Sequence, residues 1–569
     1  MTETKTFLVK TDPRILLLLG ILTISASHVS YSVDFIAWFS SVPFLLYLYQ
    51  TKGMKSRLLL VFALFVAWTL TTAKIITAPI PFVLVFLFSL PITLIHLPAY
   101  LIWDKFKNHQ YALFLFPVVF TIMEWIQYTF MPFASWGVGA NTQSHNIVLL
   151  QSLSLFGMAG LSFVIYWVNI SITEIIKTKR VHIITLQLPL ILLLILVIYG
   201  SLRLDIEKTG TTKTIAVAAV GTDSEISGFP FPDSNSTNAF KTVLINRTTS
   251  AAHQGAKLIA WNEAAIFIDK KDEKSWQDSL TLLAKDLSVS LIASYVVPLS
   301  VDPLKLENKF ISINSTGEIT HQYLKHQPVP GEPSIKGKEP FKLMSDNGIN
   351  IGAAICYDFD YPYIAKAFGK LNAHIVAIPS SDWRGIDPLH TKMAAFRAIE
   401  QGYSLLRSTR FGLSAAINPL GEMTAQQSSF DIHDKIMMAE LPTKRIKTLY
   451  SLIGDSLVFG CFAFFTLFFI QLIFKPRRHI GPQYSSLLVM TVITSILTRN
   501  DLYIKKYYYE PNPYSFANYA FADIRLYIRR TCFGVRTLVQ KQSYYNRRLL
   551  RIHTFCSRCR YSLFNRRSR

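Results

Sequence analysis

The stretch Asn350-Ile351-Gly352-Ala353-Ala354-Ile355-Cys356-Tyr357-Asp358 reads as a short buried strand that ends at a cysteine. A continuous run of small and β-branched apolar residues is typical of a strand buried inside a sheet. A helical pattern follows at 363–369, and a second buried strand is predicted at 373–379. Strands that alternate with helices predict a layered α/β fold.

The same character extends in both directions and defines a domain over 211–442. Apolar β-type runs lie at 214–220 and 257–261, and a hairpin is predicted from 310–314 and 318–323 across Ser315-Thr316-Gly317. Towards the C-terminus, 390–401 is helical and 413–418 is a strand. A segment of about 230 residues is long enough for one sizeable core.

The chain as a whole is too apolar for a soluble protein. Of its 569 residues, 50% are hydrophobic and 17% are charged, whereas soluble globular proteins carry about 25% charged residues. A bilayer-spanning helix needs about 20 mostly apolar residues. The candidate spans are 15–31, 33–49, 58–76, 80–103, 111–130, 147–170, 183–202 and 449–474. We therefore expect a seven-helix transmembrane domain over 1–205 and a C-terminal transmembrane helix over 449–474.

Charges in the loops predict the orientation, because lysine and arginine stay on the cytoplasmic side. Eleven of them lie in the N-terminal segment and in the loops after the second, fourth and sixth spans, whereas the alternate loops contain Lys74 alone. The N-terminus is therefore expected in the cytoplasm and the α/β domain outside it. The first span also has the basic flank and the small residues, Ala26-Ser27, of a signal peptide. An uncleaved anchor is the preferred interpretation.

The segment 476–569 has a different composition. It holds 18 Lys or Arg against three acids, which is +15 of the formal net charge of +22, and it is rich in tyrosine. The pair in Cys556-Ser557-Arg558-Cys559 has no second ligand pair at zinc-like spacing, so it predicts no metal site. A basic aromatic segment could bind anionic headgroups or nucleic acid. The preferred alternatives are a poorly ordered extension or a misassigned reading frame, and its role stays unknown.

Three residues at predicted strand ends could carry chemistry together. Glu263 follows the strand 257–261, Lys325 follows the hairpin, and Cys356 ends the strand 350–355. Each alone has a simpler interpretation, as a solvated charge or a core cysteine. Together they suggest a mechanism, because a carboxylate can take the proton of a thiol and an ammonium can stabilise an oxyanion. Strand ends are also where open α/β sheets place their sites.

Glu, Lys and Cys in this order, with the cysteine in Ile355-Cys356-Tyr357-Asp358, resemble the catalytic triad of the nitrilase, or carbon–nitrogen hydrolase, superfamily. That resemblance implies an αββα sandwich. Such a domain outside the membrane, after seven helices and before one more, resembles the apolipoprotein N-acyltransferase family. Other strings similar to that family, within about residues 10–475, are Trp261-Asn262-Glu263, Lys325-His326-Gln327-Pro328-Val329-Pro330-Gly331-Glu332, Ser135-Trp136-Gly137 and Gly157-Met158-Ala159-Gly160-Leu161-Ser162. A further similar run begins at His390, continues through Arg397-Ala398-Ile399-Glu400 and Leu406-Arg407-Ser408-Thr409, and ends at Gly421.

The sequence also departs from the family pattern. Asn262 replaces a proline, and the loop from Lys325 to Glu332 is one residue short. Asp358 stands where the family usually has glutamate, and Arg410 where it tends to have asparagine. The segment Ser380-Ser381-Asp382-Trp383 is one residue short as well. Because the triad is intact, we interpret these changes as changes in the acyl-binding and lid surfaces.

By this resemblance the protein is an N-acyltransferase. It would move a fatty acyl chain from a phospholipid to the N-terminal diacylglyceryl-cysteine amine of lipoproteins, through a thioester on Cys356. Glu263 is the expected base and Lys325 the expected oxyanion cation. The residues expected to bind substrate are Glu332, Tyr357 and Trp383. No metal, other cofactor or nucleic acid is expected. The enzyme is expected to be a monomer in the bacterial cytoplasmic (inner) membrane, with its catalytic domain on the periplasmic side.

Two alternatives remain at this point. A membrane-anchored amidase of the nitrilase type could hydrolyse a small C–N substrate with the same three residues, although it would not need seven preceding helices. A transporter or sensor could use the outer domain only to bind a ligand. Transport normally leaves ionisable residues inside the spans, and Glu124 is the clear case here.

Overall fold

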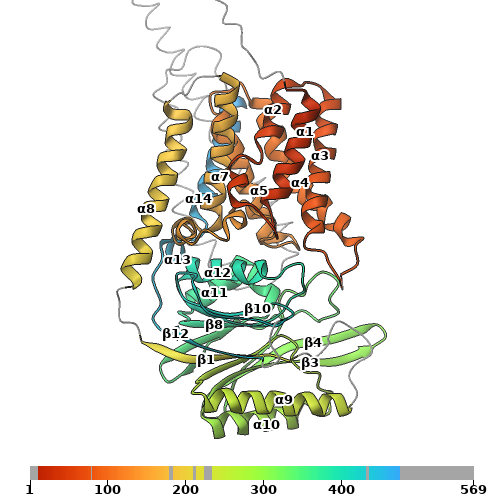
Figure 1. Ribbon diagram of the computed structural model, residues 1–569, viewed down its shortest axis with the longest axis vertical. Coiled ribbons are helices and arrows are strands. Elements are labelled where there is room, and N and C mark those ends of the chain that lie inside the picture. The colour runs from red at the N-terminus through yellow and green to blue at the C-terminus, as the bar shows by residue number, and fades with distance from the viewer. Residues whose placement is uncertain are drawn as a thin grey trace, which may run out of the picture. The chain divides into compact units, whose positions relative to one another are not determined.

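The computed structural model describes residues 11–78, 80–178, 183–208, 213–222, 234–430 and 435–473 (Figure 1). The basic tail predicted at 476–569, with its Cys556-Ser557-Arg558-Cys559 string, lies outside these residues. Lys5 and Lys10, which count among the predicted cytoplasmic charges, also lie outside these residues. So does the start of the predicted α/β domain at 211.

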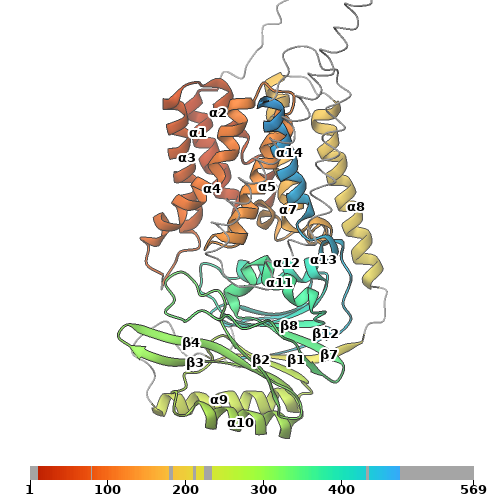
Figure 2. The same cartoon turned by 180° about the vertical axis from the view of Figure 1, so that it is seen from behind.

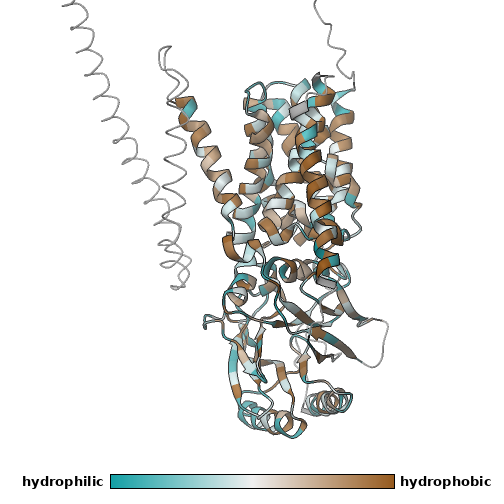
Figure 3. Ribbon diagram, turned by 90° about the vertical axis from the view of Figure 1, so that its left-hand side faces the viewer, coloured by the Kyte–Doolittle hydropathy of each residue, from teal (hydrophilic) through white to brown (hydrophobic). Residues whose placement is uncertain are grey.

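Six helices of the described residues are long and apolar enough to cross a membrane (Figure 3). These are α3 (Met54–Ala73), α4 (Leu84–Phe106), α5 (Ala112–Phe130), α7 (Leu153–Thr178), α8 (Leu188–Lys208) and α14 (Ser456–Ile473). The shorter elements of this part are α1 (Pro13–Ser27), η1 (Asp34–Phe39), α2 (Val42–Gln50), η2 (Gly139–Gln143), α6 (Ile147–Leu150), η3 (Ile183–Gln187) and α13 (Leu449–Ile453). A polytopic α-helical membrane domain is therefore confirmed, with six such helices where the sequence predicted about eight.

The first two predicted spans account for the difference. Helix α1 has 15 residues, which is short of the length that a perpendicular span needs. The segment predicted at 33–49 is divided into η1 and α2, and α2 has only nine residues. Pro43 lies in the first turn of α2. Proline is tolerated in the first turn of a helix because its missing N–H would have no partner there, which is compatible with α2 starting at Val42.

Two other predicted spans are interrupted by glycine. Within α7, Phe156 and Gly157 have non-helical dihedrals, and the φ of Gly157 is 62°. A Cβ at Gly157 would lie 2.6 Å from the ring of Tyr450, so both the backbone conformation and the close contact require glycine. Gly454, with φ 55°, separates α13 from α14. A bend at each of these positions turns the chain where the membrane part meets the α/β part.

The α/β part contains two six-stranded sheets. The first has the order β12-β1-β2-β3-β4-β5, and the second β11-β10-β9-β8-β7-β6. The strands of the first sheet are β1 (Thr214–Val220), β2 (Leu258–Trp261), β3 (Ser290–Val301), β4 (Leu304–Ile313), β5 (Ile319–Leu324) and β12 (Ile436–Pro442). Those of the second are β6 (Met344–Asp346), β7 (Ile349–Ala353), β8 (Ile375–Ser381), β9 (Ser404–Arg410), β10 (Leu413–Ile417) and β11 (Met423–Ser428). The central strands β1, β2 and β3 are parallel to one another, as are β7, β8 and β9.

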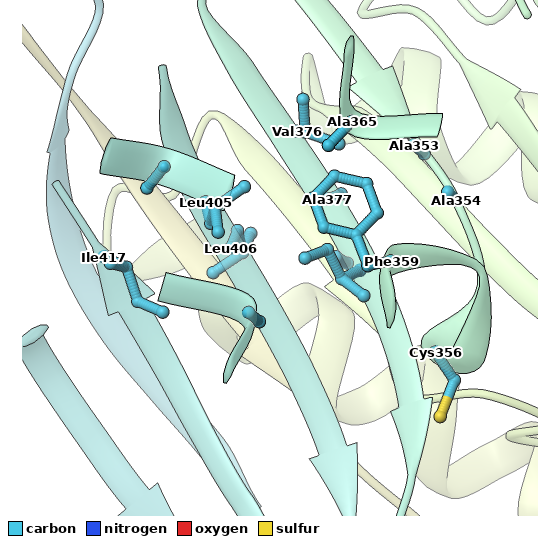
Figure 4. Close-up of a cluster of buried hydrophobic side chains, with 14 of the residues drawn as sticks. Ala353, Ala354, Cys356, Phe359, Ala365, Val376, Ala377, Leu405, Leu406 and Ile417 are labelled. Carbon is cyan, nitrogen blue, oxygen red and sulfur yellow. The ribbon is translucent and has the colours of Figure 1, made fainter. Parts of the chain in front are cut away.

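Helices cover the outer face of each sheet, which gives the expected αββα sandwich (Figures 1 and 2). Helices α9 (Ser234–His253) and α10 (Glu273–Leu287) lie on the first sheet, and α11 (Pro362–Lys370) and α12 (Leu389–Gln401) on the second. One apolar core joins the second sheet to α11 and α12 and reaches across to β1 and β2. Figure 4 shows the part of this core made by Ala353, Val376, Ala377 and Leu406, with Cys356 at its edge. The short helix η4 (Cys356–Asp360) begins at that cysteine.

Candidate active site

Three strand ends bring Glu263, Lys325 and Cys356 to one cavity. Glu263 comes two residues after β2, Lys325 directly after β5, and Cys356 three residues after β7. All three side chains are buried, and all three line a cavity of about 360 Å³. The two sheets meet here, because the N–H of Glu263 donates to the carbonyl of Ser380 at the end of β8 (3.2 Å).

Lys325 lies between two carboxylates. Its Nζ donates to Oε1 of Glu263 and to Oε2 of Glu332, each at 2.7 Å. Glu332 also accepts from Oγ of Ser334 (2.6 Å) and from the N–H of Val329 (2.9 Å). The predicted substrate-binding residue Glu332 therefore contacts the predicted oxyanion cation directly, and the shortened loop still brings it into the site.

Asn308 belongs to the same cluster and was not predicted. Its Nδ2 donates to Glu263 Oε1 (2.7 Å) and to Glu332 Oε1 (3.0 Å). Two carboxylate acceptors determine the orientation of the amide. Strand β4 also carries Lys305, Glu307 and Lys309, so no signal in the sequence singled out Asn308.

The backbone at Cys356 is held in an unusual conformation. Its φ is +47°, a left-handed value that costs a residue other than glycine about 1–3 kcal/mol and is common at functional sites. The conformation is stabilised from both sides of the turn. Ile355 N–H donates to Oδ2 of Asp358 (3.0 Å), and Asp358 N–H donates to the carbonyl of Ile355 (2.9 Å). The thiol Sγ lies 3.7 Å from the carbonyl of Ser381.

Asp358 joins the cysteine turn to the lysine loop. Besides Ile355, it accepts from the hydroxyl of Tyr323 (2.8 Å) and from the N–H of Gln327 (2.6 Å), two residues beyond Lys325. Burial raises the pKa of Asp358 to about 6. Asp358, the shorter residue at a position where the family usually has glutamate, thus accepts three hydrogen bonds, from Tyr323, Gln327 and Ile355.

The charges of the site favour a protonated thiol and a charged lysine. Burial, together with the nearby Glu263 carboxylate, raises the pKa of Cys356 well above its ordinary value. Burial would lower the pKa of Lys325, but Glu263 and Glu332 raise it well above the usual range. Burial would raise the pKa of Glu332, yet its contact with Lys325 lowers it. A resting thiol of this kind needs a base before it can act as a nucleophile.

The cavity is lined mainly by apolar side chains, with one polar cluster around the thiol. The α/β domain contributes the three candidate residues, Arg410, whose pKa burial lowers to about 10, and apolar residues such as Phe267. The membrane part contributes an apolar wall from the segment that follows α3, from α4 and from the loop after α5. The residues of that wall are Ile75, Ile76, Ile80, Leu84, Phe88, Ile92 and Phe133. A long apolar group could therefore lie along the helices while its polar end reaches the thiol.

Tyr357 and Trp383, the other predicted substrate-binding residues, line the same cavity and contact the membrane part. The hydroxyl of Tyr357 donates to the carbonyl of Pro132 (2.7 Å). The indole Nε1 of Trp383 donates to the carbonyl of Ile75 (2.6 Å). Both side chains therefore hold the α/β domain against the membrane segments in addition to bordering the cavity.

Cys356, Asp382 and His390 each place one potential metal-ligating atom within 4.8 Å of the others. Their donor atoms already have partners. Asp382 accepts two bonds from the guanidinium of Arg407, both at 2.9 Å. The two ring nitrogens of His390 contact Asp382 (2.8 Å) and Asp360 (3.0 Å). A cation, Arg407, thus already balances the charge of this cluster.

Comparison with known proteins agrees with this geometry. The family model for the apolipoprotein N-acyltransferase N-terminal domain matches residues 19–171, and that for carbon-nitrogen hydrolase matches residues 214–450. The apolipoprotein N-acyltransferase of Rickettsia prowazekii is 23% identical over 375 residues, which are 61% of this chain and 74% of that protein. The chain belongs to the apolipoprotein N-acyltransferase family.

The apolipoprotein N-acyltransferase of Geobacter metallireducens is similar to the same extent, with 23% identity over 399 residues, 64% of this chain and 75% of that protein. Among solved structures, an amidase from Nesterenkonia sp. matches with 16% identity and a TM-score of 0.35, over 44% of this chain and 99% of the amidase. Membership of the apolipoprotein N-acyltransferase family makes the protein an acyltransferase, as the resemblance implied.

Glu124 is the ionisable residue that kept the transporter alternative possible. In the structure its carboxylate has hydrogen-bond donors within the membrane part. Its Oε1 accepts from the N–H of Gly139 (2.7 Å) and from the hydroxyl of Tyr166 (2.6 Å). The carboxylate therefore joins α5 to α7 and to the loop between them, as a buried acceptor does in a packed core.

Proposed function

We propose that this enzyme transfers a fatty acyl chain from a phospholipid to the N-terminal amine of a diacylglyceryl-modified lipoprotein, through a thioester on Cys356. The observation that carries the proposal is a mainly apolar cavity with one polar cluster. The cluster of a thiol, a carboxylate and an ammonium suits ester and amide chemistry, and the apolar lining, part of it from membrane segments, suits a lipid chain. The relatives named above bear the name of this activity.

In the first half-reaction, Glu263 takes the proton of Cys356, and the thiolate attacks the carbonyl carbon of the phospholipid ester. Both hydrogen bonds that Glu263 accepts from the described side chains end on Oε1, so Oε2 is the oxygen that would take the proton. Lys325 stabilises the oxyanion, together with backbone N–H groups near Tyr357. The C–O bond then breaks, and the proton held by Glu263 passes to the leaving oxygen of the lysophospholipid.

In the second half-reaction, the lipoprotein amine attacks the thioester carbon. Glu263 accepts the amine proton as the C–N bond forms, and Lys325 again stabilises the oxyanion. The C–S bond breaks, the thiolate takes up a proton, and an amide leaves the site. Two half-reactions that share one covalent intermediate predict ping-pong kinetics. Glu332 keeps Lys325 in place, and Tyr357 and Trp383 bound the space for the lipid.

We infer a bacterial cytoplasmic membrane location with a cytoplasmic N-terminus and a periplasmic α/β domain. The loop charges support this orientation. Lys74, the single exception, has a structural role, because its Nζ donates to the carbonyls of Ser25 (2.8 Å) and His28 (2.6 Å) at the end of α1. A cation at a helix C-terminus satisfies free carbonyls. We infer a monomer, because the three candidate residues meet within a single chain.

Intact-mass analysis of the purified protein after incubation with phospholipid tests the proposal. We expect a hydroxylamine-labile mass increase of one acyl group on the wild type. It should be absent from Cys356→Ala and strongly reduced in Glu263→Ala and Lys325→Ala. Cys461→Ala is the matched control, because Cys461 is also a buried free cysteine but lies in α14.

Transfer of that acyl group to a diacylglyceryl-cysteine peptide would complete the reaction. If the wild type takes up no acyl group from any phospholipid, the lipid-donor mechanism is wrong. Release of ammonia from small amides, with no acyl transfer to the peptide, would instead favour the amidase. An acyl adduct that persists in Cys356→Ala would place the nucleophile elsewhere.

A further inference from the structure

A second group of buried charges lies beside the thiol and takes no part in the mechanism above. His390, in α12, lies between Asp360 Oδ1 (3.0 Å from Nε2) and Asp382 Oδ1 (2.8 Å from Nδ1). Arg407 binds Asp382 through both terminal nitrogens. All four side chains are buried, and ligating atoms of His390, Asp382 and Cys356 lie within 4.8 Å of one another.

The two carboxylates determine the charge of His390. A carboxylate only accepts hydrogen bonds, so each ring nitrogen next to one must carry a proton. Asp382 stays ionised, because Arg407 and His390 hold its pKa below the ordinary value despite burial. Burial and Arg407 lower the pKa of His390, but Asp360 and Asp382 outweigh them and raise it to about 9. His390 Nδ1 and Arg407 Nη2 lie 2.9 Å apart because both donate to the same acceptor, Asp382 Oδ1. They do not bond to each other.

The same network reaches the membrane part through Trp136. The indole Nε1 of Trp136 donates to Asp360 Oδ2 (2.8 Å), and its ring lies 5.5 Å from that of His390. Asp360 is the last residue of η4, the short helix that begins at Cys356. Trp136 itself is held by α5, since Nε2 of Gln127 donates to its carbonyl (2.6 Å).

Two further bonds join the same segments. The hydroxyls of Tyr357 and Tyr361 donate to the carbonyls of Pro132 (2.7 Å) and Met131 (3.3 Å). Tyr357 and Asp360 in η4, and Tyr361 directly after it, therefore attach this helix to segment 131–136 by three hydrogen bonds. Segment 131–136 belongs to the membrane part, whereas η4 belongs to the α/β domain.

We propose that His390 is a cationic positioning residue, and that Trp136, Asp360 and His390 together hold the Cys356 turn in its reactive conformation against membrane segment 131–136. The left-handed backbone at Cys356 costs free energy that neighbouring contacts must offset. The network supplies those contacts at the far end of η4. It also places the charge of His390 close to the thiolate, where a cation favours the ionised form. The nucleophile is thus positioned in part by the membrane domain.

The proposal rests on Cys356 being the nucleophile, and two variants of the full-length protein test it. Trp136→Phe keeps a ring beside His390 and removes the N–H that Asp360 accepts. Trp125→Phe is the control, because its indole also donates to an aspartate, the partly buried Asp455 (3.1 Å), away from the cavity. His390→Gln removes the cation and keeps a side chain of similar length.

The first readout is the pH profile of Cys356 alkylation by iodoacetamide, followed on the Cys356 peptide by mass spectrometry. It needs no acyl donor, so it stands even if the phospholipid mechanism fails. The groups that face His390, namely Asp360, Asp382, Arg407 and Cys356, are otherwise unchanged. We expect His390→Gln to shift the profile to higher pH and Trp136→Phe to lower the plateau rate about tenfold, the loss typical of one charge-assisted hydrogen bond.

The second readout is thermal stability in detergent. We expect Trp125→Phe to lose as much stability as Trp136→Phe with an unchanged alkylation profile. Equal profiles for the wild type, Trp136→Phe and His390→Gln would overturn the proposal. So would a loss of reactivity in Trp125→Phe that matches the loss in Trp136→Phe, because the effect would then follow general destabilisation.

Discussion

Replacement of Lys325 by methionine would leave two carboxylates buried without their cation. Nζ of Lys325 lies 2.7 Å from both Glu263 and Glu332, and the lysine side chain is 2% exposed. Removal of one member of a buried ion pair costs about 3–5 kcal/mol, since the remaining charge is uncompensated. For a domain of this size, that free energy corresponds to a melting temperature lowered by roughly 6–20 °C.

The effect on chemistry should be separate from the effect on stability. Loss of one oxyanion donor typically slows a reaction by about 10²–10³-fold, so we expect acyl-enzyme formation in Lys325→Met to slow by at least that factor. Adding Glu332→Gln removes one of the two uncompensated charges. The double variant should therefore regain part of the lost stability and none of the lost activity.

The substitution should also reverse the way in which folding stability depends on pH. In the wild type, the pKa of Glu332 is lowered from 4.5 by Lys325, so its contribution is present above pH 4.5 and is lost as the pH falls further. In Lys325→Met, burial without the lysine charge should raise the pKa of Glu332. Its ionisation then opposes folding, and the stability of the variant should increase as the pH falls from 7 towards 5. Burial raises the pKa of Asp358 and Lys325 opposes that effect, so the loss of the lysine should raise that pKa further and add to the same trend.

The assays are differential scanning fluorimetry between pH 4 and 8 and the intact-mass time course. Lys336→Met is the matched control, because Lys336 is exposed and donates only to Gln327 (3.0 Å) among the described side chains. Equal melting temperatures for Lys325→Met and Lys336→Met at pH 7 would refute the buried ion-pair reasoning. Recovery of acylation in the double variant would refute the proposed role of Lys325.

Three other substitutions test separate parts of the site. Asp358→Ala removes the acceptor of the Gln327 N–H and should slow acylation by about tenfold or more, because a buried charged hydrogen bond contributes about 1.5–3 kcal/mol; an unchanged single-turnover rate would contradict this. Trp383→Phe removes the donor to the Ile75 carbonyl and should lower the melting temperature and raise the KM for phospholipid while kcat changes little, which steady-state kinetics can show. Ile92→Trp should fill the apolar end of the cavity and reduce acylation from long-chain donors more than from short-chain donors in a competition assay.

Much of the α/β fold could be predicted from short-range patterns. The run at 214–220 coincides with β1 because it is apolar throughout, and Ser315-Thr316-Gly317 marks the turn between β4 and β5. Strand β9 has no such pattern. It carries the buried charges Arg407 and Arg410, and their partners, Asp382 and Ser381, come from β8 and the loop after it. A strand whose polarity is balanced by distant residues cannot be recognised from its own sequence.

The candidate site shows the same division. The order of Glu263, Lys325 and Cys356, and their positions at strand ends, could be read from the sequence. The contacts of Asn308 and His390 could not be read from the sequence, although His390 begins a run similar to the family, because a strand or helix pattern does not say which side chains meet across the fold. In the membrane part, apolar length predicted the long helices but not the division of 33–49 into η1 and α2, nor the break at Gly157, which depends on the conformation of glycine and on contact with Tyr450.

The apolar wall of the cavity has a consequence for how the enzyme should be measured. Because α4 and the segment before it contribute to that wall, we expect the proposed phospholipid donor to reach the thiol while its chains remain in the hydrocarbon phase. Encounter is then two-dimensional, and the rate should follow the mole fraction of donor in the micelle or bilayer. Added detergent should slow the reaction by surface dilution even when the bulk phospholipid concentration is constant, so apparent KM values are comparable only at a fixed ratio of lipid to detergent.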